Sequence, residues 1–132
     1  MSFDRNHERY RFAAERFTNT SRKRRQAVDH LASSFVGNGI LHALLEIAGA
    51  ARHGYLTDDE AVRETLCLRL VSEKLLPPGG DGRQLIAACI QELLQLQGAS
   101  RWRAIDEEAA AMLAVMKLFA KATEVKQENP AP

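Results

Sequence analysis

The residues best suited to hold a metal ion lie on one apolar stretch of the sequence. His42, Glu46 and His53 follow one another at spacings of four and seven, which would place them on one stripe of a helix. A histidine and a glutamate four residues apart can share a metal ion. His42 and His53, however, would be about 16 Å apart at roughly 1.5 Å of rise per residue, so the three cannot bind one ion. We interpret them as a polar stripe and predict no metal site.

The usual signatures of nucleophilic catalysis and of phosphate-binding loops are missing from the sequence. Ser33 and Ser34 fall inside a predicted helix, without the flanking glycines of a nucleophile elbow. The Gly-Gly-Asp-Gly stretch at 79–82 has neither the lysine of a Walker loop nor the spacing of a Rossmann loop. The sequence therefore predicts a protein that is not an enzyme and that carries no cofactor.

The cysteines and the hydropathy of the chain indicate a cellular location. Cys67 and Cys89 each lie in an apolar stretch and form neither a CxxC pair nor a metal-ligand pattern. We interpret them as buried thiols in a reducing compartment, with a disulfide between them as the alternative. The first residues are polar, and no run reaches the roughly 18 apolar residues of a membrane span. These features predict a cytoplasmic protein with no membrane partner.

The charges of the chain are unevenly distributed. Residues 1–25 carry eight basic and three acidic side chains, a net charge of +5, whereas the remaining residues carry a net charge of −4. The run Arg22-Lys23-Arg24-Arg25 falls in the first turn of a predicted helix, where the dipole favours anions over cations. Free backbone N–H groups and arginine side chains at a helix start can bind phosphate. Together with Arg16, this run predicts a nucleic-acid-binding surface.

Two other interpretations concern the same N-terminal quarter. The basic run is alternatively a solvated face whose charges pair with Asp4, Glu8 or Glu15. Aromatic side chains could stack on bases, but at helical spacing they are more often part of the core. We therefore expect Tyr10, Phe12 and Phe17 to be core residues.

The spacing of apolar residues predicts six helices and no strand. The first has a stripe at Phe3, His7, Tyr10, Ala14 and Phe17. Residues 18–21 offer capping side chains for a second helix, with Val28, Leu31, Ala32, Phe35 and Val36 on one face and an end at 37–39. The most apolar helix, 40–52, should be central. A capping box at 57–60 starts a fourth helix, and a fifth covers 85–94.

The sixth helix, capped by Ser100 or Asp106, has the most regular pattern. Its apolar residues recur at spacings of three and four over more than two heptads. They are Trp102, Ile105, Ala109, Met112, Met116 and Phe119. Such a seam packs inside a bundle or forms a partner interface. In the second case Trp102, Ile105, Met112, Met116 and Phe119 would bind another protein or form a homodimer.

The length of 132 residues fits one domain. We predict an all-α, compact bundle of five to six helices over residues 1–122. Residues 123–132 lack periodicity and are predicted to be a disordered tail.

Residues 38–94 carry a pattern of small, apolar and acidic residues in a particular order. The residues are Asn38, Ala43, Ile47, Ala48, Gly49, Gly54, Leu56, Glu60, Ala61 and Leu66. This order resembles the helical segment that follows the catalytic domain in phage and plasmid primase-polymerases. The chain departs from that family at its second connector, 75–80, and at 85–88, where Leu-Ile-Ala-Ala replaces a Thr-Ile-x-Ser-Gly ending. The catalytic carboxylates of the polymerases are absent from it.

The charge distribution and the resemblance lead to one functional expectation and one alternative. The resemblance implies an accessory module of mobile-element replication rather than a primase. We therefore expect a non-enzymatic module that contacts the phosphates of DNA or RNA through its basic N-terminal surface. The alternative is a small helical module for protein–protein interaction, acting as an adaptor or an inhibitor.

Overall fold

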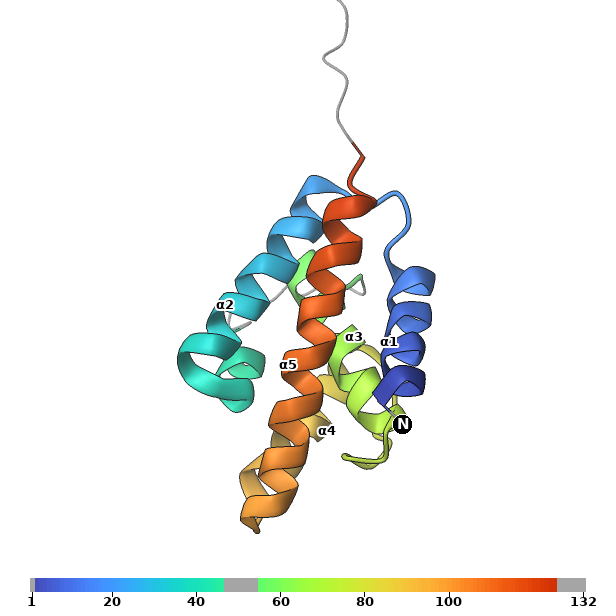
Figure 1. Cartoon of the computed structure of the whole chain (residues 1–132). Coiled ribbons are helices and arrows are strands. Elements are labelled where there is room, and N and C mark those ends of the chain that lie inside the picture. Colours follow the sequence, from blue (N-terminus) through green and yellow to red (C-terminus); the bar gives the residue numbers. More distant parts are fainter. Residues whose placement is uncertain (1, 47–54, 126–132) are drawn as a thin grey trace, which may run out of the picture.

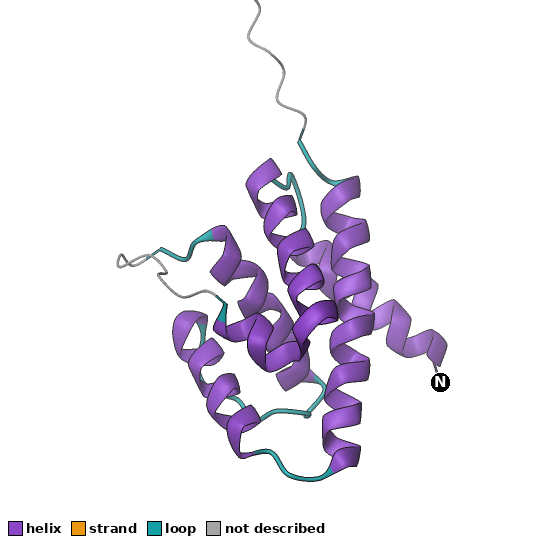
Figure 2. Ribbon diagram, turned by 90° about the vertical axis from the view of Figure 1, so that its left-hand side faces the viewer, coloured by secondary structure: helices purple, strands orange, loops and turns teal. Residues whose placement is uncertain are grey.

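The computed structural model describes residues 2–46 and 55–125, which form five α-helices and no strand (Figures 1 and 2). The helices are α1 (Ser2–Arg16), α2 (Arg22–Leu45), α3 (Asp58–Ser72), α4 (Gly82–Gln95) and α5 (Ala99–Ala122). The predicted all-α bundle is confirmed. Within the described residues, no helix is both long enough and apolar enough to cross a membrane.

Local side-chain chemistry sets two of the helix starts. The Ser21 hydroxyl accepts the Arg24 backbone N–H at 3.0 Å and caps α2. At α3, Thr57 Oγ1 accepts the Glu60 N–H at 3.1 Å while Glu60 Oε1 accepts the Thr57 N–H at 2.9 Å. The predicted capping box is therefore confirmed. The predicted cap of the last helix is wrong: α5 follows Gly98, and Ser100 and Asp106 lie inside it.

The second predicted helix continues into the third. Gly39 has φ +85° and ψ 173°, so the backbone bends there, and residues 40–45 prolong α2. Glycine reaches this φ without strain, which lets it bend a helix as well as end one. Ile40 and Leu44 beyond the bend are fully buried, as expected of a central segment. Residues 47–52 of the predicted helix lie outside the described residues.

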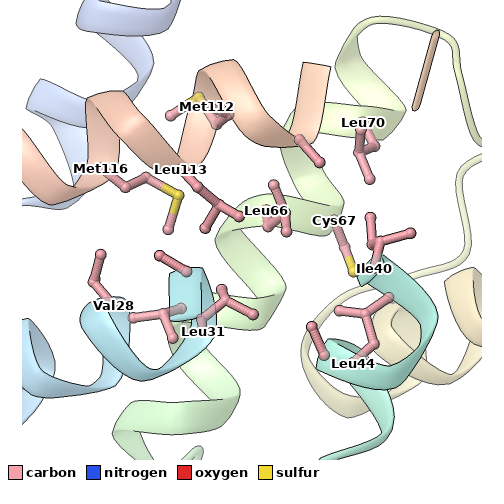
Figure 3. Close-up of a cluster of buried hydrophobic side chains, with 14 of the residues drawn as sticks. Val28, Leu31, Ile40, Leu44, Leu66, Cys67, Leu70, Met112, Leu113 and Met116 are labelled. Atoms are coloured by element: carbon pink, nitrogen blue, oxygen red, sulfur yellow. The ribbon is translucent and has the colours of Figure 1, made fainter. Parts of the chain in front are cut away.

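The core forms where α2, α3 and α5 meet (Figure 3). Val28 and Leu31 of α2 lie near Leu66 of α3 and Met116 of α5. Helix α3 packs against α2, α4 and α5, and more than half of its residues are buried. Figure 1 shows α5 between α2 on one side and α1 on the other.

The buried face of α1 differs from the predicted stripe. Arg9, Ala13 and Phe17 are buried, whereas His7 and Ala14 are exposed. An arginine does not register in an apolar pattern, yet Arg9 faces inward because it pairs with a buried glutamate of α5. The prediction also placed Val36 on the buried face of α2, but that side chain is 83% exposed.

The predicted disordered tail begins too early. Thr20 and Glu124 form an isolated parallel β-bridge. The Thr20 N–H donates to Thr123 O, and the Val125 N–H donates to Thr20 O, each at 2.9 Å. Residues 123–125 are therefore ordered against the start of α2, because backbone hydrogen bonds need no apolar periodicity. The rest of the predicted tail lies outside the described residues.

Candidate functional site

Two of the four cations in the basic run at the start of α2 form ion pairs within the chain. Arg24 Nε donates to Asp58 Oδ1 at 2.8 Å. Arg25 Nη1 donates to Asp29 Oδ2, and its Nε lies 2.8 Å from Glu124 Oε1. The acidic partners therefore come from α2, α3 and the C-terminal segment, rather than from Asp4, Glu8 or Glu15. Arg22 and Lys23 are exposed and form no ion pair with any described residue.

Arg16, the fifth predicted phosphate contact, belongs to the end of α1. Its guanidinium lies 3.9 Å from the centre of the Phe12 ring, and its Nη1 is 3.7 Å from the Glu15 carboxylate. Of the three aromatic residues expected in the core, Phe17 is buried and Phe12 is half-buried. Tyr10 is 44% exposed, with its ring tilted against Phe119, so the expectation that it is a core residue is wrong. The N-terminal quarter therefore has fewer unpaired cations and fewer exposed aromatic rings than its sequence indicates.

The predicted interface seam of α5 lies inside the bundle. Ile105, Met112 and Met116 have no exposed surface, because this stripe faces α1, α2 and α3. Trp102 is half-buried and donates its Nε1–H to Leu96 O at 3.2 Å, and Phe119 is half-buried beside Tyr10. The expectation of a partner surface is therefore wrong for Ile105, Met112 and Met116, and it stays a prediction for the half-buried Trp102 and Phe119. The heptad pattern marked a core-facing stripe.

A surface groove runs between α2 and α5, on another side of α5. Its larger hollow, about 670 Å³, is lined mainly by small and apolar residues. They are Ala32, Ser33, Phe35, Val36 and Gly37 of α2 and Ala110, Leu113 and Ala114 of α5. A second hollow of about 560 Å³ shares Asp29, Ala114 and Lys117 with the first. The two hollows therefore form one groove, which we call the α2/α5 groove.

The two ends of the α2/α5 groove differ in character. Near Gly37 it is apolar, with the exposed Val36 on its rim. At the other end it is lined by Arg25, Leu118 and Lys121, of which Leu118 is 62% exposed. Lys117 and Lys121 are exposed and pair with no acidic side chain among the described residues. The groove thus combines exposed aliphatic side chains with unneutralised positive charge.

Sequence reasoning missed this groove for identifiable reasons. Much of its α5 side is the stripe Ala110, Ala114, Lys117 and Lys121, at spacings of four and three. Alanine and lysine on a helix read as an ordinary solvated face. The weak available signal was the regularity of this second stripe, opposite the apolar seam.

The buried charges of the molecule form networks that join helices. Glu108 of α5 accepts from Arg9 of α1 at 2.7 and 2.9 Å and from Arg69 of α3 at 3.0 Å. Burial acts to raise the pKa of Glu108, but the two arginines outweigh it and hold that pKa below its usual value. Glu60 similarly accepts from Arg83 of α4 at 2.6 and 3.0 Å. These networks join α1 and α3 to α5, and α4 to α3. The charged side chains in them are already paired within the fold.

The remaining predicted groups give no catalytic or metal arrangement within the described parts of the chain. His42 and Glu46 are exposed, and His53 lies outside those parts. No cluster of three metal-binding side chains occurs in residues 2–46 or 55–125. Cys67 and Cys89 are both buried, and they are free thiols rather than a disulfide. A hydrogen bond to Cys89, together with burial, raises the pKa of the Cys67 thiol, so it is a poor nucleophile.

The chain was compared with protein-family models, with curated proteins and with solved structures. None of the three comparisons gives a match. The resemblance of residues 38–94 to the primase-polymerase segment therefore stays a prediction.

Proposed function

We propose that this chain is a protein-interaction module that binds its partner in the α2/α5 groove. The observation that carries the proposal is the combination of an apolar groove with exposed Val36 and Leu118 and unpaired Lys117 and Lys121. Exposed apolar surface rimmed by charge is typical of protein-binding sites. A groove between two helices suits the apolar face of an amphipathic helix. The two lysines favour a partner helix with acidic residues at one end.

The proposal is tested with two labelled amphipathic helical peptides of the same apolar face. One peptide carries acidic residues at one end, and the other carries basic residues there. We expect the chain to bind the acidic peptide more tightly, as measured by fluorescence anisotropy, and the preference to weaken as salt rises.

A matched pair of variants locates the binding. Leu118→Glu introduces a negative charge into the groove, whereas Leu94→Glu makes the same change on α4, where the leucine is 60% exposed. Leu118→Glu should abolish peptide binding and Leu94→Glu should preserve it. Equal binding by the two variants, or no binding by the wild type, contradicts the proposal.

Nucleic-acid binding is a second candidate, supported by one specific observation. Arg22 and Lys23 are exposed at the start of α2, and Arg25 lines one hollow together with Lys117 and Lys121. These exposed cations could contact the phosphates of DNA or RNA without reading sequence. The resemblance of residues 38–94 is the basis for placing either function in phage or plasmid replication.

An oligonucleotide titration at two salt concentrations tests this candidate. If phosphates bind here, Arg22→Ala/Lys23→Ala should reduce the salt slope by about one unit for each phosphate that the variant no longer binds. Lys74→Ala, a change at an exposed lysine in the turn after α3, is the control. Absence of binding at low salt excludes this candidate.

A further inference from the structure

The exposed stripe of α5 changes the sign of its charge along the helix. Glu107 lies toward the N-terminal end, Ala110 and Ala114 follow, and Lys117 and Lys121 lie toward the C-terminal end. All five side chains are exposed. Neither Glu107 nor the two lysines pair with another described residue. One strip of surface therefore carries an acid, a pair of small residues and two bases in linear order.

Such a strip is complementary to itself when it is turned end over end. A twofold axis makes the same surface meet itself, with the two helices antiparallel. With the axis near Ala114, Glu107 and Lys121 each lie seven residues from it, or about 10.5 Å along the helix. Glu107 of each copy then lies opposite Lys121 of the other. A parallel pairing would instead place like charges together.

The shape of the same surface supports this pairing. Ala110 and Ala114 have small side chains, so a second helix can approach α5 closely. Leu118 lies four residues beyond the axis and Ala110 four residues before it, so the exposed leucine of each copy covers the other's alanine. The α2 helices flank the contact, which produces a four-helix arrangement across the two copies.

We propose that the occupant of the α2/α5 groove is a second copy of this chain, with the two α5 helices antiparallel about an axis near Ala114. This inference rests on the proposed docking role of the groove and names its partner. A helix of another protein, with acidic residues at one end, is the other occupant that the groove's charge would accept.

Charge exchange within the chain tests the pairing directly. Sedimentation equilibrium of the full chain should show a monomer–dimer equilibrium. Glu107→Lys places lysine opposite lysine, and Lys121→Glu places glutamate opposite glutamate. Each should raise the dimer dissociation constant about tenfold at low salt, because two ion pairs become repulsive. The double variant Glu107→Lys/Lys121→Glu restores opposite charges and should return that constant to within about threefold of the wild-type value.

Two further variants separate this interface from others. Leu118→Glu should give a monomer, and Leu94→Glu, the matched change on α4, should leave the dimer intact. Ala114→Cys lies on the proposed axis and should form a disulfide-linked dimer under mild oxidation, while Ala87→Cys on the exposed part of α4 should not. Circular dichroism confirms that each variant is folded.

The outcomes separate failure of this inference from failure of the proposed function. A wild-type chain that stays monomeric up to about 1 mM overturns the self-association, since most grooves would then hold no second copy even at that concentration. A double variant that remains as weak as the single variants overturns it equally. If such a monomer still binds the acidic peptide in a Leu118-dependent way, the groove is a docking site for another protein. If the chain binds neither a second copy nor the acidic peptide, both proposals fail.

Discussion

The arginines of this chain fall into two groups with opposite surroundings. Arg9, Arg63 and Arg69 stand singly in the sequence and are buried, whereas Arg22 and its neighbours stand in a run at the surface. Arg63 is fully buried, with Nε donating to Ala43 O at 2.7 Å and Nη1 to Asp59 O at 3.1 Å. Clustered charge draws attention in a sequence, but isolated arginines make the buried polar contacts between helices in this protein.

The two groups should differ sharply in what they contribute to stability. A buried arginine must be paired, because an uncompensated buried charge costs several kcal/mol. A surface arginine loses little when its partner is removed, because water and salt screen the charge. Three experiments below test this contrast by substitution or by change of pH, and a fourth compares it with a local capping contact.

The largest effect is expected at Glu108. Glu108→Ala leaves Arg9 and Arg69 buried without their shared carboxylate and should lower the free energy of unfolding by about 3–5 kcal/mol. Glu107→Ala, one residue earlier on the exposed face, should change it by less than about 0.5 kcal/mol. Urea unfolding of both variants measures the difference. If Glu108→Ala lowers the free energy of unfolding no more than Glu107→Ala does, the network does not contribute to the stability of the fold.

Acid should weaken the same network. The pKa of Glu108 is lowered in the folded state, so its contribution is present above the ordinary value of 4.5 and is lost as the pH falls below it. Glu60, whose pKa is lowered by Arg83 and Thr57 against the effect of burial, adds a decrease in the same window. Each group contributes a slope of up to about 1.4 kcal/mol per pH unit.

Urea unfolding at several pH values from about 5 to about 3 measures how steeply the free energy of unfolding falls with pH. Glu108→Gln cannot titrate and should flatten that slope, while Glu107→Gln should not. Equal slopes in the two variants would show that Glu108 has the same pKa in the folded and unfolded states.

The capping box of α3 should contribute less than the buried network. Thr57→Ala removes the acceptor of the Glu60 N–H and should cost about 1 kcal/mol. Thr18→Ala, at an exposed position in the loop before α2, is the control. Thermal unfolding followed by circular dichroism compares them. If the two variants melt together, the box does not limit the stability of α3.

The elements that were predictable from the sequence are the ones governed by neighbouring residues. Ser21 and Thr57 cap helices because their partners are three residues away, so the pattern alone indicated both helix starts. Gly39 was recognised as a break, but a glycine that bends a helix and one that ends it look alike in sequence. Two segments that the pattern separated are therefore one helix, and the five helices of the described residues lie within the predicted five to six.

Contacts between distant residues explain why the rest was not predictable. The regular spacing of Met112 and Met116 showed that one stripe of α5 is apolar, but it did not show whether that stripe packs inside this chain or against another. The α2/α5 groove brings Val36 and Ala110 together across more than half of the chain, through a packing that no local pattern encodes. Arg25 was assigned to phosphate although Asp29 is four residues away; its second carboxylate partner, Glu124, is 99 residues away and no local pattern indicates it.

The smallest effect is expected at the exposed half of the basic run. Arg22 and Lys23 lie in the first turn of α2 without ion pairs among the described residues, where the helix dipole disfavours cations. Arg22→Ala/Lys23→Ala should therefore leave the melting temperature unchanged or raise it slightly. The free energy of unfolding should rise by no more than about 1 kcal/mol for each charge removed.

Arg24→Ala/Arg25→Ala removes two cations from the same turn but also breaks the ion pairs with Asp58, Asp29 and Glu124. This second double variant should be equal to the wild type or up to about 1 kcal/mol less stable for each ion pair removed. Scanning calorimetry at low salt compares the two, and a lower melting temperature for Arg22→Ala/Lys23→Ala than for Arg24→Ala/Arg25→Ala would reverse the assignment of free and paired charge at this helix start.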